Sequence, residues 1–503
     1  MQYKWIALSN TTTGTLMASL DTNIIIIALP AIASDLHTSL LTLVWIVLGY
    51  WLVTAAVLMN LGRLSDMLGR VRLYNLGFIV FTIGSALCSI SQTGEQLMLF
   101  RVVQALGAAF LFSNSAAIIT DAFPEKERGR ALGLNQVSIV AGSVVGLLFG
   151  GLLTSYLGWR SIFWINIPIG LFAIIWSYTK LRELGIIKKE KVDWVGNATL
   201  AGGLFLILIG ITFGSFGIFS NGNNGFSVYL FVIGGLALIA LFVFIEKKVI
   251  RPMFDLSLFK IKSFVGGDIA IFLNAIARGA LSLIMTFYLQ GPLMKLSPLA
   301  AGIYLLPVSV ALSICGPISG WASDRYENGS RILSPIGLFI SSIGFFMLTE
   351  IGTRVSFNDT LLPLSLIGAG MGIFASPNRA LIMSSVPANR RGIAAGTSTT
   401  LVLTGSTFSL GLSFLIMTHI MPLGNVENIL LGSFGSENHI NSGNNNNNNN
   451  NNSNSSIVGS LEMDKFVDSI HIIFLVSAIL MLIAIVPSVL RKEKKQPRSG
   501  ISG

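Results

Sequence analysis

Fourteen long apolar segments constrain this 503-residue chain more than any other feature of its sequence. An α-helix needs about 20 mostly apolar residues to cross the hydrocarbon core of a bilayer, and each segment is long enough. Charged residues make up only 11% of the chain, and a soluble protein could not bury so much apolar surface. The sequence therefore predicts an all-α integral membrane protein. The segments span residues 6–30, 42–61, 73–92, 97–120, 131–154, 161–180, 194–215, 226–246, 264–290, 298–322, 332–351, 360–383, 394–418 and 468–490.

The Lys and Arg residues alternate between the two sides of these segments. Loops after even-numbered segments are basic, as is the C-terminal tail, whereas loops after odd-numbered segments hold only Arg160, Lys295, Arg354 and Lys465. Cytoplasmic loops of membrane proteins carry such an excess. The alternation predicts a multi-pass protein of the plasma membrane with both termini in the cytoplasm. Because the net charge of +10 is spread over these loops and the tail, we expect no nucleic-acid partner.

The loop at 419–467 differs from the others in composition. It contains an unbroken run of asparagines at 444–452, flanked by Ser and Gly. Such a segment holds too few apolar residues to offset the entropy of ordering it. We predict that this loop is disordered and lies outside the cell.

Two short motifs occur twice in the chain, at nearly equal offsets. The pattern Gly-x-x-x-Asp follows the second segment at Gly62–Asp66 and the tenth at Gly320–Asp324. A longer pattern, Pro-x-x-x-Arg-Gly-x-Ala-x-Gly, begins at Pro124 and again at Pro387. An internal repeat of this kind predicts two six-helix bundles with two helices inserted between them. The predicted units are 1–180, the linker with two extra helices at 181–262, and 263–503.

Four signatures resemble the major facilitator superfamily, and in particular its 14-helix drug:proton antiporters. Residues 62–72 resemble the loop signature of the superfamily, and Arg101-x-x-Gln104-x-x-Gly107 resembles its fourth-helix signature. Leu20-Asp21 with Ala28-Leu29-Pro30, and residues 158–170, are typical of the 14-helix branch. The antiporter signature of the fifth helix is incomplete, because Leu147 replaces its proline.

The resemblance implies a secondary active transporter that works by alternating access, with proton-coupled efflux of small amphipathic compounds as the first expectation. A metabolite or nutrient symporter or uniporter of the same superfamily, and a membrane receptor that does not transport, stay open as alternatives. The expected partners are a small-molecule substrate, protons and the lipid bilayer, and we expect a monomer. The sequence has no ATP-binding loop and no clustered metal ligands, so we expect neither enzyme activity nor a cofactor.

Charged residues within the apolar segments are the candidate site residues, because a charge inside a membrane is costly. Asp21, Arg101 and Arg278 lie on segments that line the central cavity in this superfamily. Asp21 is the deepest carboxylate and the predicted proton carrier; the alternative is a permanent structural ion pair with an arginine. The predicted proton-coupling and cavity residues are Asp21, Arg101, Gln104, Asn274 and Arg278.

Two further groups of residues have predicted roles. The resemblance implies a gating latch in which Asp66 faces the N-terminal end of the thirteenth segment and Arg70 pairs with Asp121. The residues assigned to the latch are Gly62, Asp66, Gly69, Arg70, Asp121, Asp324 and Arg325. Small residues allow membrane helices to approach closely. We expect this helix-packing role for Gly142, Gly146, Gly150 and Gly151.

Overall fold

The computed structural model describes residues 2–185, 193–215, 225–248, 256–326, 329–353, 355–387, 390–430 and 449–490. In these ranges every regular element is a helix, and fourteen helical spans are long and apolar enough to cross a membrane. The predicted all-α membrane fold with fourteen spans is therefore confirmed.

The first six spans are formed by seven helices, because the sixth span is broken at Ile165 into α6 and α7. These helices are α1 (Tyr3–Leu36), α2 (Leu40–Leu68), α3 (Arg70–Ser89), α4 (Gly94–Ala122), α5 (Glu125–Leu157), α6 (Ser161–Trp164) and α7 (Asn166–Lys180). We call this group the N-terminal half. In it, α1 packs mainly against α5 and α4, and α3 packs against α4 and α7.

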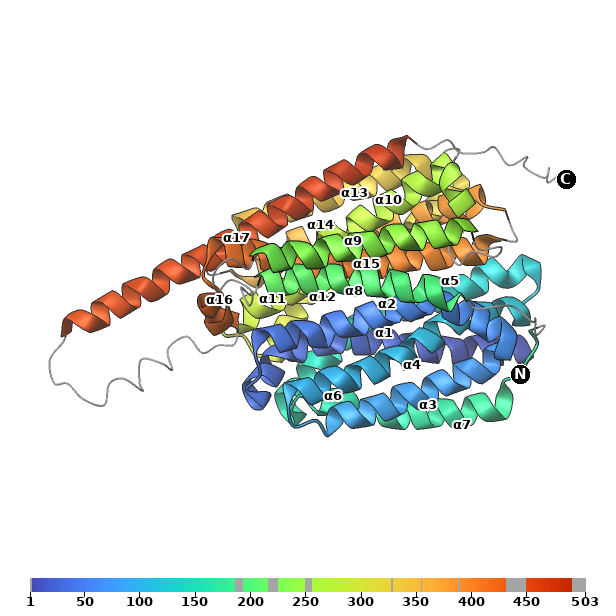
Figure 1. Cartoon of the computed structure of the whole chain (residues 1–503), viewed down its shortest axis with the longest axis horizontal. Coiled ribbons are helices and arrows are strands. Elements are labelled where there is room, and N and C mark those ends of the chain that lie inside the picture. The colour runs from blue at the N-terminus through green and yellow to red at the C-terminus, as the bar shows by residue number, and fades with distance from the viewer. Residues whose placement is uncertain are drawn as a thin grey trace.

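Two helices follow, α8 (Trp194–Ser215) and α9 (Gly225–Lys248), which pack against each other. Helix α8 also contacts α2 and α15, so it bridges the two sides of the molecule. In Figure 1 this pair lies beside the seam between the blue and the orange helices.

The rest of the chain, which we call the C-terminal half, supplies the last six spans. Its α-helices are α10 (Lys262–Arg278), α11 (Leu281–Gln290), α12 (Pro298–Arg325), α13 (Gly329–Met347), α14 (Phe357–Ser385), α15 (Arg391–Ile420), α16 (Leu423–Leu430) and α17 (Asn449–Val489). Two short 3₁₀ helices, η1 (Leu256–Lys260) and η2 (Leu348–Glu350), accompany them. The start of α1 and the end of α17 lie at the same end of the molecule (Figure 1). We call that end the terminal face and the other end the opposite face.

The ninth apolar segment, expected as one run over 264–290, is interrupted between α10 and α11. A Cβ on Gly279 would lie 2.7 Å from the Ser406 Cα of α15, so only glycine permits this approach. The backbone N–H of Ala280 donates to Ser409 Oγ at 2.9 Å. A neighbouring helix thus supplies a partner for backbone at the break, as membrane-embedded irregular structure requires.

The prediction of a disordered loop over 419–467 is wrong at both described ends. Helix α15 continues to Ile420, α16 covers Leu423–Leu430, and α17 begins at Asn449. Extending an existing helix costs far less than nucleating a new one, so the membrane-spanning part of α17 can propagate into polar sequence. The Asn run lies partly outside the described residues.

Glycines on α5 set how closely it packs against α1. A Cβ at Gly142, Gly146 or Gly150 would lie 2.7–2.8 Å from a backbone oxygen of α1, those of Leu16, Leu20 and Ile24 respectively. Real Cβ atoms do not approach so closely, and the obstacle is backbone rather than a flexible side chain. Gly151 faces the other half, where its Cβ would lie 2.6 Å from the Pro298 carbonyl oxygen.

We therefore expect Gly146→Ala to destabilise the folded protein by about 1–3 kcal/mol, the usual cost of overpacking a core. The matched control is Gly133→Ala on the same helix, because a Cβ at Gly133 meets nothing within 4 Å. Thermal unfolding of the purified variants measures the effect. Equal melting temperatures for the two variants would contradict the packing argument.

Candidate functional site

A buried ion pair joins α1 to α4 within the N-terminal half. Asp21 and Arg101 are 0% and 1% exposed, and Arg101 Nη1 donates to Asp21 Oδ2. The other carboxylate oxygen, Oδ1, accepts from Gln104 Nε2 at 2.8 Å and from Asn166 Nδ2 at 2.9 Å. The Asp21 carboxylate therefore receives hydrogen bonds from three side chains, contributed by two other helices.

A second set of contacts holds the partners of Asp21 in place. Arg101 Nη1 also donates to Gln104 Oε1 at 2.6 Å, and its guanidinium lies 4.1 Å from the centre of the Tyr50 ring on α2. Gln104 Nε2 donates to Ser85 Oγ of α3 at 2.7 Å. Five helices of the N-terminal half, α1, α2, α3, α4 and α7, thus contribute to one charge pair and its contacts.

Asn166 is a site residue that sequence reasoning missed. It is fully buried and begins α7, directly after the break at Ile165. Its Nδ2 donates to Asp21, whereas its Oδ1 has no hydrogen-bond partner among the described residues. The residue stands inside the 158–170 signature, but nothing in that pattern indicates that it meets α1. A carboxylate only accepts, and a neutral acid also donates, so the free Oδ1 is an acceptor available to a protonated Asp21.

The reaction open to this arrangement is proton exchange at Asp21, since a carboxyl group accepts hydrogen bonds when ionised and donates one when protonated. Two buried charges in a medium of low dielectric constant are tolerable only as a well hydrogen-bonded pair. A proton on Asp21 would cancel the carboxylate charge and leave Arg101 with the Tyr50 ring and Gln104 as its neighbours. Protonation therefore changes how strongly α1 and α4 are held together.

The C-terminal half holds further charged and polar residues within its membrane spans. Arg278, the last residue of α10, makes no hydrogen bond or ion pair with the described residues. Asn274, which the sequence assigns to the proton-coupling and cavity residues, donates from Nδ2 to Met481 Sδ of α17 at 3.4 Å. Asp268 is buried and accepts from Ser398 Oγ of α15 at 2.6 Å. Among these residues only Arg278 is left with an unsatisfied charge.

The two halves are tied together near the opposite face. Gln290 Nε2 of α11 donates to the Ile27 carbonyl of α1 at 2.9 Å. The Leu299 N–H of α12 donates to Ser155 Oγ of α5 at 3.2 Å, and the Leu40 N–H of α2 donates to Glu427 Oε1 of α16 at 3.1 Å. Together with the close approach of Gly151 to Pro298, these bonds close the molecule at that face.

Leu147, the residue that replaces the signature proline, lies in the same interface. It is buried, and a Cβ on Gly302 of α12 would lie 2.6 Å from its carbonyl oxygen. Nearer the terminal face, Arg379 Nη1 of α14 donates to Gln136 Oε1 of α5 at 2.8 Å. Helices α5 and α12 are therefore in tight contact despite the missing proline.

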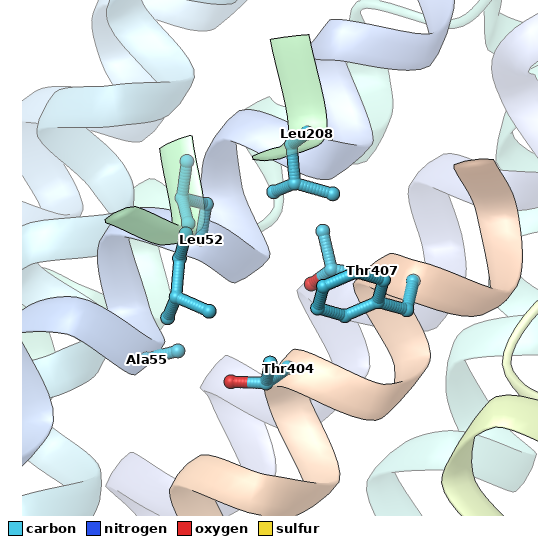
Figure 2. A pocket seen from close by; sticks show the side chains of 7 residues that line it. Leu52, Ala55, Leu208, Thr404 and Thr407 are labelled. Carbon is cyan, nitrogen blue, oxygen red and sulfur yellow. The ribbon is translucent and has the colours of Figure 1, made fainter. Parts of the chain in front are cut away.

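An apolar crevice lies apart from the charge pair, between α2, α8 and α15 (Figure 2). Its empty volume is about 180 Å³, and it is too narrow to hold a water molecule. Leu52, Leu208 and Thr407 point into it from the three helices. We regard it as an imperfect packing seam beneath α8 and not as a substrate site.

The residues predicted to form a latch meet at the terminal face. Arg70 Nη1 lies 2.7 Å from both carboxylate oxygens of Asp121, which is the expected pair. Asp66 differs from the prediction. Its partner in the described part of the chain is Arg70, at 2.8 Å, and not the start of α15. The side chain needs only one helical turn to reach Arg70, and this local pair has prevailed over the longer contact.

Gly69 and Glu183 complete this cluster. Gly69 has φ +105°, a backbone conformation that favours glycine, and it ends α2 directly before α3 begins. Glu183 Oε2, from the segment after α7, accepts from the Val71 N–H at 2.8 Å and so caps α3. Gly62 lies one helical turn before Asp66, and a Cβ on it would lie 4.0 Å from Ser113 Oγ. Glu183 was missed because it lies far from the motif in sequence.

The related motif of the C-terminal half does not show a matching cluster. Arg325 is exposed and lies over the Trp321 ring, with 5.4 Å from guanidinium carbon to ring centre. The Asp324 side chain lies outside the described residues. No counterpart of the Arg70–Asp121 pair is therefore seen in this described part of the chain.

We expect Arg70→Gln to lower transport several-fold without lowering the amount of folded protein. The arginine joins two carboxylates, and its loss leaves Asp66 and Asp121 facing each other as like charges. Arg72→Gln is the matched control, since Arg72 is exposed and lies on the same helix start. Transport per folded molecule is measured for both. Equal rates for the two variants would mean that Arg70 has no gating role and serves only as one of the basic loop residues that orient the protein in the membrane.

Comparison with known proteins places these observations in context. The family model described as Major Facilitator Superfamily matches residues 11–410. The riboflavin transporter RibZ of Clostridioides difficile is 33% identical over 420 residues, which are 82% of this chain and 88% of that protein. Multidrug resistance protein 3 of Bacillus subtilis is 28% identical over 479 residues, covering 94% and 92%.

A solved structure shares the fold. It is a bacterial homologue of the human lysosomal transporter Spinster, in an inward-facing and unoccupied conformation. The TM-score is 0.63 at 16% identity, with 97% of this chain and 96% of that chain covered.

Proposed function

This chain belongs to the major facilitator superfamily, and from that premise we propose that it exports small amphipathic compounds in exchange for protons. The observation that carries the proposal is the Asp21–Arg101 pair, which is buried among side chains from five helices. A group that takes up and releases a proton is what proton coupling requires, and a carboxyl group such as that of Asp21 can do both, since it accepts hydrogen bonds when ionised and donates one when protonated. Relatives named as multidrug resistance proteins support export as the direction.

Alternating access would use the asymmetry between the two faces. The bonds of Gln290, Leu299 and Glu427 close the opposite face, so they must break for that face to open. We propose that residues 1–180 and 263–503 rock as two units about the tight α5–α12 contact, while 181–262 follows at their side. With both termini in the cytoplasm, the state described here would be closed to the outside.

A second candidate is transport of a vitamin or another metabolite. It is favoured by one observation, the 33% identity to a protein named as a riboflavin transporter. The site geometry itself suits either role, since Asp21 couples to protons and does not choose the substrate.

The test is transport by purified protein in liposomes. An imposed proton gradient should drive accumulation of a substrate, with proton flux in the opposite direction. Candidate compounds would include multidrug substrates and riboflavin in parallel assays. Saturable binding without any flux would refute the transporter proposal, and flux that ignores the proton gradient would refute the coupling.

The proposed orientation predicts which engineered cysteines are accessible. In a background in which Cys88 and Cys315 are replaced by serine, an impermeant thiol reagent added to intact cells should label a cysteine at Ser453. It should spare a cysteine at Ser499 until the cells are lysed. The reverse pattern would invert the topology and place the opposite face in the cytoplasm.

A further inference from the structure

We propose that Arg278 binds an anionic group of the transported compound, so that the substrates are organic anions carrying a carboxylate, sulfonate or phosphate. This inference rests on the proposed function, because it assigns the substrate class of the same transporter. It concerns the C-terminal half, whereas the proton site lies in the N-terminal half.

The position of Arg278 explains why its charge needs a ligand. It lies within one membrane span that runs from Lys262 to Gln290. At 1.5 Å per residue it is about 24 Å from one end of that span and about 18 Å from the other. Neither end is within reach of an arginine side chain, so the guanidinium cannot escape to the headgroup region.

The surroundings of Arg278 offer no protein partner. In the described ranges the side chain makes no hydrogen bond or ion pair, although protein surrounds it. Its exposure is intermediate, and its helix α10 packs against α14, α15 and α17. The break behind it is fixed by α15, through the Ala280–Ser409 bond and the close contact of Gly279 with Ser406. Contacts with α15 therefore fix the backbone that carries the Arg278 side chain.

The nearby acids are already occupied. Asp21 receives bonds from Arg101, Gln104 and Asn166, so the N-terminal site is electrically neutral. Asp268 lies ten residues before Arg278, about 15 Å along the helix, and accepts from Ser398. Asp21 is thus the partner of Arg101, and Asp268 lies about 15 Å from Arg278 along the helix, so neither acid supplies the counter-charge of Arg278.

An unpaired charge within a membrane protein costs at least a few kcal/mol, and a bound counter-charge would offset that cost. Guanidinium recognises carboxylate and phosphate with two parallel hydrogen bonds. Arg379, an exposed arginine of α14 nearer the terminal face, adds positive potential along the approach from that side. A cationic compound would meet repulsion from both arginines, and an anionic one would be drawn to Arg278.

The experiment compares ligands that differ only in charge. Binding of dansylglycine, its neutral amide and the cationic N-(2-aminoethyl)dansylamide is measured by fluorescence, with the full chain in nanodiscs and no proton gradient. We expect the carboxylate to bind at least tenfold more tightly than the amide. Arg278→Gln should abolish this preference, Arg278→Lys should keep part of it, and Arg72→Gln should leave it unchanged.

A second measurement needs no ligand. Because Arg278 lacks a protein partner, Arg278→Gln should not lower the melting temperature of the unliganded protein. The proposal is overturned if the carboxylate binds no more tightly than its amide, if the preference survives in Arg278→Gln, or if that variant is destabilised without ligand. It is also overturned if the preference appears only in nanodiscs that lack anionic lipid, because Arg278 would then be a lipid headgroup site. Failure of proton-driven flux alone would leave the binding result standing.

Discussion

Asp21→Asn is expected to abolish efflux against a concentration gradient while leaving downhill exchange of substrate. Asparagine has nearly the size of aspartate and can still bond to Arg101 and Gln104, but it cannot take up a proton. The side chain is fully buried among these partners, so the substitution preserves the packing and leaves Arg101 without its counter-charge, as a proton on Asp21 would. The measurement is pH-driven accumulation in liposomes, followed by exchange of labelled substrate at equal pH on both sides.

Two controls make this expectation specific. Asp21→Glu should retain part of the pumping activity, because it keeps a titratable group near Arg101. Asp268→Asn should pump almost normally, since Asp268 is buried against Ser398 in the other half. Uphill transport by Asp21→Asn with an unchanged pH dependence would mean that another group carries the proton, and the coupling role proposed for Asp21 would be wrong.

The Asp21 site shows how far sequence reasoning reaches. Asp21, Arg101 and Gln104 stand out because charged and polar residues are rare in apolar segments, and each contacts the others in the structure. Asn166 could not be found in this way. It lies 145 residues from Asp21, and its placement depends on the break that separates α6 from α7. No local pattern encodes a contact between segments so distant in sequence.

The predicted latch residues also show what a sequence motif can and cannot predict. The Arg70–Asp121 pair follows from the motif and is present, but the motif does not show whether Asp66 faces another helix or its own turn. The choice depends on the relative position of the two halves, which changes during transport and which a single sequence does not record.

The sequence alone did not predict the helix break between α10 and α11, nor which of the buried charges pair with each other. The run 264–290 is predominantly apolar, so composition alone predicts one helix; the interruption arises from contacts of Gly279 and Ala280 with α15. The sequence also left the preferred charge of the substrate open, since Asp21, Arg101 and Arg278 could not be paired. In the structure Arg101 pairs with Asp21, whereas Arg278 makes no ion pair or hydrogen bond among the described residues.

Arg101→Met is expected to harm the folded protein more than the removal of both charges does. Breaking a buried pair by removing one partner leaves an uncompensated charge and costs about 3–5 kcal/mol. The double variant Asp21→Asn with Arg101→Met has no buried charge, so it should regain most of the lost thermal stability. Arg160→Met is the matched control, because the Arg160–Asp35 pair is largely exposed and should contribute less than about 1 kcal/mol.

The pH dependence separates this charge effect from lost packing. A proton on Asp21 removes the unpaired charge, so the stability deficit of Arg101→Met should be small in acid and should grow as the pH rises. Lost contacts between the arginine and the Tyr50 ring would cost the same at every pH and would persist in the double variant. A double variant no more stable than Arg101→Met, with a deficit independent of pH, would show that Arg101 acts by packing. The ion pair could then not be the element through which protonation of Asp21 loosens α1 from α4.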